Sequence, residues 1–328
     1  MEARIVGRPE AGQKLFRYLQ KMLPEAPDSF LHKMLRKKNI ELSGHGKCTG
    51  AEILAEGDTV RFFLSGETFR KFGGIAPGGK PSPEGTGFEA KAPIPAAERL
   101  ARAHTDVIYE DEDFLFVSKP AGLLVQGDRS GAKSLADLLE ACSPPDSLTK
   151  WSPMHRLDRN TSGLVLCGKT VGGQQFLAKA LRERTVKKEY LALIRGHLPR
   201  EGSFKAFHAK DPRTNRVRIL EEQRPGSEPI ETIFHEIARR GGHSLIRAEL
   251  VTGRSHQIRA HLAHLGCPIV GDLKYGGMDP EFPEARTQLL HAERVTFAEN
   301  AEKLAGEFFA APVPASMKGV LRQNGFHE

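Results

Sequence analysis

A run of glycine and proline residues near position 75 limits what this chain can fold into. Between Gly73 and Pro95 the sequence reads GGIAPGGKPSPEGTGFEAKAPIP, and 11 of these 23 positions are Gly or Pro. No helical or strand-like hydrophobic period survives at that density of residues that break secondary structure. We therefore expect a flexible linker over residues 73–98, with a long ordered loop as the alternative. The chain of 328 residues then divides into a small unit, residues 1–72, and a large unit, residues 99–328.

The small unit combines two helical patterns with an excess of positive charge. Apolar residues within 15–23 recur at helical spacing, and a second helix is expected through residues 29–40, where Asp28 or Ser29 can cap its start. Short strands are expected at residues 40–42 and 59–64. Residues 1–72 hold 13 Lys and Arg against 9 Asp and Glu, and the polar side of the second helix carries Arg36, Lys37 and Lys38. A basic helical face is commonly only a solvated face, so the charge by itself does not establish a binding surface.

The order of these elements resembles the S4 RNA-binding domain. The resemblance rests on Gln13 to Leu15, on the helix from Leu31 to Lys37, and on the strand turn from Gly57 to Val60. One departure is Ser43-Gly44, where that family usually has Asn-Gly. The resemblance implies a small α/β domain in which Arg36, Lys37 and Lys38 contact RNA phosphates. Such contacts position RNA without reading its sequence.

The large unit alternates short strands with fewer helices. Strands are expected at residues 106–109, 114–118, 164–167, 188–194, 217–220, 231–237 and 244–251. Helices are expected at residues 134–142, with Ser134 as N-cap, and at residues 174–183 and 255–265. Because strands outnumber helices and several follow one another directly, we expect an α+β fold with a mainly antiparallel or mixed sheet and flanking helices.

The composition excludes several classes of protein. Hydrophobic residues make up 39% of the chain and charged residues 27%, as in ordinary soluble globular proteins. No stretch approaches the roughly 20 apolar residues that cross a bilayer, and the N-terminus lacks an apolar signal region, so we expect a cytoplasmic protein that does not bind membranes. The 4 cysteines are scattered, which predicts neither a disulfide framework nor a zinc ribbon. A net charge of +7 is compatible with a polyanionic partner but does not require one.

Two patterns suggest ligands on weak grounds. Residues 163–170, GLVLCGKT, fit the phosphate-binding loop of nucleotide-binding proteins, in which Lys169 would contact ATP. The four residues between the two glycines are all apolar, however, and predict a buried strand rather than a loop around phosphates. His256, His261 and His264 lie close together in an expected helix, but no acidic residue accompanies them to complete a metal site. Polar surface or contact with phosphate explains these histidines better.

Residues 155–164, HRLDRNTSGL, carry the most specific motif. A single Asp in a loop is usually a turn or capping group. The whole string, however, is similar to the catalytic motif of the RluA family of pseudouridine synthases. This resemblance implies that Asp158 is the family's essential aspartate. It also implies that Arg156 lies where the family has an arginine that can fill the space left by a flipped base.

Two further segments extend the resemblance. Residues 188–196, KEYLALIRG, resemble the family's K-x-Y-x-A-x-x-x-G segment, whose tyrosine lies against the target uracil. Tyr190 is therefore the candidate for stacking and for assisting proton removal at C5. Residues 252–259, TGRSHQIR, resemble the family's TGRTHQIR, and the serine at 255 keeps the hydroxyl. Within this segment Arg259 is the candidate partner of Asp158, Arg254 is the alternative partner, and both Arg254 and His256 are candidate RNA contacts.

The resemblance also includes residues 119–123, KPAGL, and spans most of the chain outside the linker and the C-terminal tail. It implies an RNA pseudouridine synthase that acts on structured RNA, with large-subunit rRNA as the first expectation and tRNA as the alternative. A non-catalytic RNA-binding or ribosome-assembly factor and a phosphotransferase are the alternative classes.

The expected reaction breaks the C1′–N1 bond of uridine and forms a C1′–C5 bond. Because this is an isomerisation, we expect no cofactor, no nucleotide and no metal, and we expect a monomer. A carboxylate can attack C1′ or remove a sugar proton in a glycal route, and the sequence leaves both routes open. An adjacent arginine would favour the ionised carboxylate.

Overall fold

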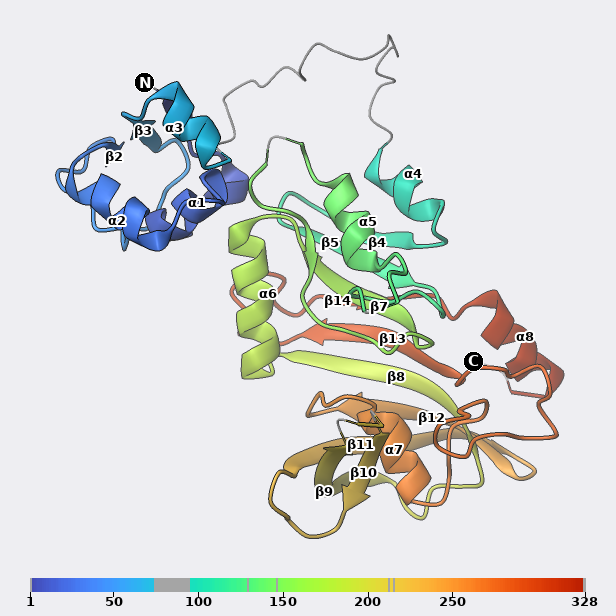
Figure 1. Ribbon diagram of the computed structural model, residues 1–328. Coiled ribbons are helices and arrows are strands. Elements are labelled where there is room, and N and C mark those ends of the chain that lie inside the picture. The colour runs from blue at the N-terminus through green and yellow to red at the C-terminus, as the bar shows by residue number, and fades with distance from the viewer. Residues whose placement is uncertain are drawn as a thin grey trace.

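Two β-sheets organise the chain (Figure 1). The computed structural model describes residues 2–73, 95–128, 130–145, 147–211, 213–214 and 216–326. Most of the expected linker, residues 74–94, lies outside the described residues. The expected end of the linker at residue 98 is too late, because helix α4 (Ala96–Ala101) already begins at Ala96.

A three-stranded antiparallel sheet belongs to the small unit. Its order is β1-β3-β2, with β1 (Glu2–Ile5), β2 (Ile40–Leu42) and β3 (Thr59–Phe62). The helical elements are the short 3-10 helix η1 (Arg8–Glu10), α1 (Leu15–Met22), α2 (Asp28–Arg36) and α3 (Gly66–Lys71). The sequence patterns predicted α1, α2, β2 and β3. They did not predict β1, whose side chains alternate between exposed and half-buried, or the short α3.

The small unit has its own hydrophobic cluster. Leu15 and Leu19 of α1 are fully buried against Leu31 of α2, and Val60 and Phe62 of β3 close the cluster. Burial of an aliphatic side chain of this size contributes roughly 1.5–3 kcal/mol. The helical spacing in the sequence therefore corresponds to a real apolar interface.

The start of α2 differs from the sequence prediction. The helix begins at Asp28, Pro27 occupies the N-cap position, and no side chain caps the helix. Asp28 instead accepts a hydrogen bond from Gln20 at 2.9 Å, from Gln20 Nε2 to Asp28 Oδ1. At the other end of the helix, Arg36, Lys37 and Lys38 are exposed.

An eleven-stranded mixed sheet forms the large unit. Nine strands follow the order β10-β9-β11-β12-β8-β13-β7-β5-β4, while β14 pairs with β13 and β6 pairs with β7. Among the described pairs only β7 and β13 are parallel. The strands are β4 (Asp106–Glu110), β5 (Phe114–Lys119), β6 (Ser152–Pro153), β7 (Ser162–Gly168), β8 (Val186–Arg195), β9 (Gly202–Asp211), β10 (Arg216–Leu220), β11 (Glu228–Arg240), β12 (His243–Leu250), β13 (Leu290–Phe297) and β14 (Phe308–Ala310).

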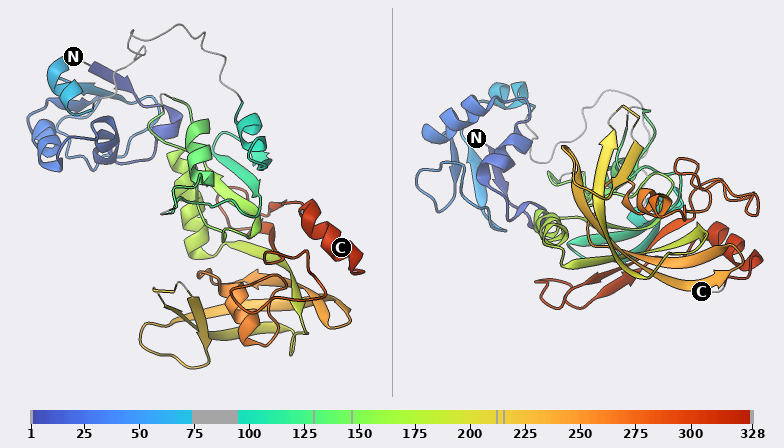
Figure 2. Two further views of the ribbon diagram at one scale, coloured as in Figure 1. Left: turned by 45° about the vertical axis from the view of Figure 1, so that its right-hand side comes forward. Right: turned by 90° about the horizontal axis from the view of Figure 1, so that it is seen from below.

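Helices cover both faces of this sheet (Figures 1 and 2). On one face, Leu115 and Val117 of β5 belong to a cluster with α5 (Leu135–Cys142) and α7 (Gln257–His264). On the other face, the alternate residues Phe114 and Phe116 pack with α6 (Val171–Glu183), and α8 (Ala315–Gln323) covers Leu191 and Leu193 of β8. The α+β prediction with a mainly antiparallel sheet is confirmed. No helix in the described ranges is both long and apolar enough to cross a membrane.

Most expected elements of the large unit are present, but several strands were not predicted. Ser134 is the N-cap of α5 as expected, and it forms a capping box with Asp137. The sequence patterns gave no indication of β9, β13 or α8. Strand β13 follows a long loop, and its assignment depends on β7 and β8, which are distant in sequence.

The two units contact each other through η1, which lies against α6. The carboxylate of Glu10 is buried there and accepts hydrogen bonds from the Ser147 hydroxyl at 3.1 Å and the Leu148 N–H at 3.0 Å. Arg8 forms ion pairs with Glu112 and Asp113. The contact between the units is therefore mostly polar.

Candidate active site

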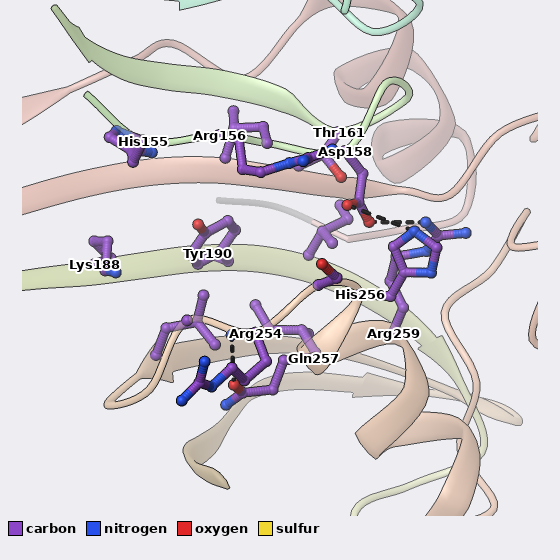
Figure 3. A pocket seen from close by; sticks show the side chains of 16 residues that line it. His155, Arg156, Asp158, Thr161, Lys188, Tyr190, Arg254, His256, Gln257 and Arg259 are labelled. Carbon is purple, nitrogen blue, oxygen red and sulfur yellow. Dashed lines mark hydrogen bonds and ion pairs between the residues drawn. The ribbon is translucent and has the colours of Figure 1, made fainter. Parts of the chain in front are cut away.

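A cavity of about 270 Å³ opens between the loop before β7, strand β8 and the start of α7 (Figure 3). Residues 155–158 line one side and residues 253–259 line the opposite side. Tyr190 and Lys188 of β8 lie between them. The three segments that the sequence singled out therefore meet at one place, although 30 to 100 residues separate them along the chain.

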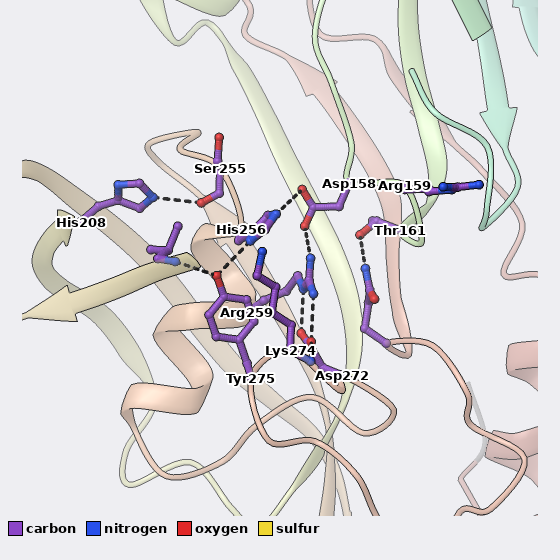
Figure 4. A network of polar contacts seen from close by, with 12 residues as sticks. Asp158, Arg159, Thr161, His208, Ser255, His256, Arg259, Asp272, Lys274 and Tyr275 are labelled. Carbon is purple, nitrogen blue, oxygen red and sulfur yellow. Dashed lines mark hydrogen bonds and ion pairs between the residues drawn. The ribbon is translucent and has the colours of Figure 1, made fainter. Parts of the chain in front are cut away.

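Asp158 is held at the rim of this cavity by an arginine. Arg259 Nη1 donates to Asp158 Oδ2 at 2.8 Å, while Arg259 Nε and Nη2 donate to the two carboxylate oxygens of Asp272 at 2.6 and 2.9 Å (Figure 4). Burial alone would lower the pKa of Arg259, but Asp272 and Asp158 outweigh it and hold the pKa above its ordinary value. The guanidinium is thus fixed on one carboxylate and presents its remaining edge to the other.

His256 and Tyr275 complete this polar network. His256 Nε2 lies 3.8 Å from Asp158 Oδ1, and its Nδ1 lies 2.9 Å from the Tyr275 hydroxyl. The Tyr275 hydroxyl also accepts the Val217 N–H at 3.1 Å, and its ring lies 5.2 Å from the Arg259 guanidinium. Burial lowers the pKa of His256 to about 4, so the imidazole is neutral at pH 7. Of these two side chains, Arg259 and not His256 therefore carries a positive charge beside Asp158 at neutral pH.

Tyr190 supplies an aromatic surface inside the cavity. Its side chain is almost entirely buried, and no described residue makes a hydrogen bond to its hydroxyl. Burial, and secondarily the charge of Asp158, raise the pKa of Tyr190 well above its ordinary value. The phenol is therefore neutral at physiological pH, which suits stacking better than action as a phenolate base.

The arginines of the motifs occupy different positions. Arg156 is exposed at the edge of the cavity (Figure 3). Arg254 also lines the cavity, but its guanidinium pairs with Glu228 at 2.9 Å rather than with Asp158. Of the two candidate partners of Asp158, Arg259 therefore makes the contact and Arg254 does not. Arg36, Lys37 and Lys38 lie in the small unit, outside the lining of this cavity.

The structure adds residues whose roles the sequence did not reveal. Lys119 is fully buried, and its ammonium donates to the carbonyls of Pro120, Leu123 and Arg159 at 2.8, 2.8 and 3.1 Å. Burial lowers the pKa of Lys119 to about 7, while the charge of Asp158 acts in the opposite direction. These bonds tie the end of β5 to the loop that carries Asp158. The signal in the sequence that could have indicated this role is the lysine at the end of the apolar strand FLFVS.

Gln257 and Asp272 have supporting positions of the same kind. The Gln257 amide donates to Glu231 O and Thr232 Oγ1 and accepts from Thr252 Oγ1 and the Arg254 N–H, all within 3.1 Å. It thereby fixes the turn that carries Arg254 and His256. Gln257 and Asp272 are part of longer sequence motifs. Their supporting roles were not visible in the sequence because their hydrogen-bond partners lie in other segments of the chain.

The two weak ligand patterns have structural explanations. Residues 162–168 form β7, so the apolar residues of GLVLCGKT are a central strand, and Lys169 Nζ binds Glu110 and the Asp111 carbonyl at 2.7 Å each. His261 is buried against Thr232, with Nδ1 3.1 Å from Oγ1, and burial lowers its pKa to about 4. Within the described part of the chain, no three His, Cys, Asp or Glu side chains gather as metal ligands do.

Comparisons with known proteins agree with the motifs in this cavity. Residues 113–264, which include the Asp158 loop, Tyr190 and Arg259, match the family described as RNA pseudouridylate synthase. The ribosomal large subunit pseudouridine synthase C of Pasteurella multocida is 31% identical over 96% of this chain and 91% of its own length. The chain belongs to the RNA pseudouridylate synthase family.

Further relatives support this membership. The ribosomal large subunit pseudouridine synthase C of Escherichia coli (strain K12) is 31% identical over 96% of this chain and 93% of its length. The corresponding synthase D of Neisseria meningitidis serogroup A is 35% identical over 66% of this chain and 60% of its length. The solved structure of human RNA pseudouridylate synthase domain containing 4 covers 71% of this chain and 96% of its own, with a TM-score of 0.58 and 20% identity, and shows the shared fold.

Membership of the RNA pseudouridylate synthase family makes this chain an isomerase. It also excludes the phosphotransferase that the GLVLCGKT pattern suggested. The family match covers the three motifs and the cavity lining apart from Leu290, whereas residues 1–112 and 265–328 lie outside it.

Proposed function

We propose that this protein converts uridines of large-subunit ribosomal RNA to pseudouridine, with Asp158 as its essential catalytic residue. The observation that carries the proposal is the Asp158 carboxylate, fixed by Arg259 at 2.8 Å beside a cavity with room for one nucleobase and an aromatic wall. The named relatives support the substrate class, since they are ribosomal large subunit pseudouridine synthases.

The geometry supports an ionised carboxylate as the reacting group. Isomerisation develops positive charge at C1′ when the bond to N1 breaks, and a carboxylate can attack C1′ or stabilise this charge. In a glycal route the same carboxylate removes a sugar proton. Arg259 lowers the cost of holding a negative charge in a partly dry pocket, because its own position is fixed by Asp272.

The remaining residues of the cavity hold the target base. A base in structured RNA must leave its stack at a cost of a few kcal/mol. Stacking on the neutral Tyr190 ring offsets roughly 1–3 kcal/mol of that cost. In this proposal Arg156, exposed at the entrance, occupies the space that the base leaves, and His256 and Arg254, which also line the cavity, contact the nearby backbone.

The small unit acts in this proposal as an S4-like RNA-binding domain, residues 1–72. Its exposed Arg36, Lys37 and Lys38 supply phosphate contacts, while residues 99–328 carry the catalysis. We also propose that the enzyme works as a cytoplasmic monomer without a nucleotide or other cofactor, because the isomerisation consumes no redox equivalent and no phosphate energy.

The exchange of Asp158 for Asn tests the proposal directly. On an unmodified transcript of large-subunit rRNA, Asp158→Asn is expected to lower pseudouridine formation at least about 10³-fold, since the amide can neither attack C1′ nor carry a charge. RNA affinity should change less than about threefold, because the fold and the cations remain. The readout is pseudouridine mapping of the transcript together with a binding titration.

Asp106→Asn provides the matched control, since Asp106 is exposed on β4 and lines no part of the cavity. This variant should retain normal modification. Pseudouridine formation by Asp158→Asn at the wild-type rate would contradict the assignment of Asp158.

A further inference from the structure

Lys188 stands at the junction of two cavities. The cavity that contains Asp158 shares Lys188, Leu250, Gly253 and Arg254 with a second cavity of about 440 Å³. The second cavity continues along β8 toward the end of α6 and includes Arg184. In Figure 3, Lys188 lies on the same strand as Tyr190 and on the side away from Asp158. The two cavities therefore form a continuous furrow that passes Lys188.

The ammonium of Lys188 lies near another cation, Arg184. Among the residues that the structure describes, none makes an ion pair or hydrogen bond with it. Burial, and then the charge of Arg184, lower the pKa of Lys188, and the charge of Lys188 in turn contributes to a lowered pKa of His155. A Cβ placed on Gly253 would lie 3.4 Å from Nζ, so the backbone of the 252–257 turn packs directly against the ammonium.

The neighbouring cations differ from Lys188 in this respect. Lys187 Nζ binds Glu189 at 3.2 Å and Glu249 at 3.1 Å, and the second of these carboxylates also lines the second cavity. Arg254 is neutralised by Glu228 at 2.9 Å. Among the cations that line the second cavity, Lys188 and Arg184 are thus the two for which the described chain supplies no carboxylate. Leaving the half-buried ammonium of Lys188 unpaired is costly, and an anionic ligand removes that cost.

We propose that Lys188 and Arg184 form a binding site for a phosphodiester group of the RNA strand beside the target uridine, with the adjoining nucleotide in the second cavity. This inference rests on the proposed function. Lys188 and Tyr190 are two positions apart on β8, which separates them by about 6.6 Å along the strand. That spacing is comparable with one extended nucleotide, so a base stacked on Tyr190 places a flanking phosphate within reach of Lys188.

Arg184 suits the second half of the same site. It occupies the C-cap of α6 in the left-handed conformation, with φ 59°, and its side chain is exposed at the far end of the furrow. A phosphate there can accept from the compact ammonium and from the planar guanidinium together. The partners of both side chains are then supplied by the substrate and not by the protein.

A scan of neutral phosphates tests the site with the full-length enzyme. The probe is a synthetic RNA hairpin that contains a uridine mapped on the rRNA transcript, with one methylphosphonate at a time within two nucleotides of the target. For the wild type, one of these positions should raise KM about tenfold with little change in kcat, the loss expected for one charge-assisted hydrogen bond. On the hairpin without a methylphosphonate, Lys188→Met should already have this raised KM. A methylphosphonate at the sensitive position should not raise the KM of Lys188→Met further.

Three further variants make this result specific. Lys187→Met removes the same charge from the same strand and should keep the wild-type response to methylphosphonates. Lys188→Arg should recover most of the affinity, and Arg184→Gln should reduce the response at the same phosphate. Arg184→Gln also tests the site if Lys188→Met does not fold, since residue 184 is exposed.

The possible failures are separable. If the wild type forms pseudouridine but Lys188→Met keeps its full response at every flanking phosphate, the phosphate site is wrong and the proposed function stands. A wild-type enzyme that forms no pseudouridine on the rRNA transcript would overturn both.

Discussion

Arg259 shows how one side chain connects the fold to the carboxylate of Asp158. Two of its nitrogens are bound by Asp272, which is almost completely buried, and the third reaches Asp158. A lysine at this position has the charge but not the planar fork, and it cannot satisfy both carboxylates with the same geometry.

His256 gives a pH-dependent expectation at the same scale. Burial lowers its pKa to about 4 in the folded chain, against about 6.5 when unfolded. Between these values the unfolded chain binds more protons, so stability falls as the pH drops from 6.5 toward 4. Asn tolerates the left-handed φ of 53° at this position. The variant His256→Asn should therefore fold, and on acidification its free energy of unfolding should fall by up to about 3 kcal/mol less than that of the wild type.

The measurement is the free energy of unfolding in denaturant at pH 7 and pH 4.5. His155 and His261, whose pKa values burial lowers to about 3 and about 4, keep part of the pH dependence in both proteins. An identical loss of stability in the variant and the wild type would contradict the expectation.

At the scale of elements, strand β7 joins the Asp158 loop to the centre of the sheet. Gly163 adopts a φ of +115°, and a Cβ there would lie 2.2 Å from the carbonyl oxygen of Ala292 in β13. This approach belongs to the parallel β7–β13 pair, in which Ala292 is opposite Gly163. The glycine at the end of HRLDRNTSG therefore allows the loop to enter the sheet directly.

Gly163→Ala is expected to destabilise the fold by at least about 2 kcal/mol, because the methyl group must separate two central strands. Chemical denaturation measures the loss. Gly172→Ala is the matched control, since its Cβ in α6 would meet only Thr170 Oγ1 at 4.0 Å, and it should stabilise by about 0.5–1 kcal/mol. Equal stability of the two variants would show that the close approach of Gly163 to Ala292 does not require a glycine.

The same scale shows why some elements were predictable. The N-cap at Ser134 and the apolar spacing in α1 are local, because the residues that fix them are within one or two helical turns. Strand β13 depends on neighbours far away in sequence, since it pairs with both β7 and β8. A strand with a mixed pattern has no local property that identifies its partner.

At the scale of the whole molecule, two units with different charges share one substrate in the proposed function. The small unit carries the exposed cations of α2, while the buried carboxylate of Glu10 fixes its contact with the large unit. RNA that spans both units would then be held by phosphate contacts in one and enter the cavity of the other.

The triple variant Arg36→Gln, Lys37→Gln, Lys38→Gln tests this arrangement. If the three side chains bind phosphates, the slope of log affinity against log salt should become shallower by about two to three units. The rate constant for bound substrate should stay near the wild-type value, since the cavity is unchanged. The measurement is a binding titration at several salt concentrations with single-turnover kinetics, and an unchanged slope would argue against an S4-like role.

The sequence by itself determined the class of fold, the three segments that meet at the cavity and the family, because these depend on local periodicity and on ordered strings of residues. It left open whether Arg254 or Arg259 contacts Asp158, since both are cations in one motif. The tertiary structure decided this, because Glu228 from β11 neutralises one and Asp272 orients the other. It also distinguished Lys188 from its paired neighbour Lys187. Charge pairs form between residues brought together by packing, and their partners cannot be read from the order of the chain.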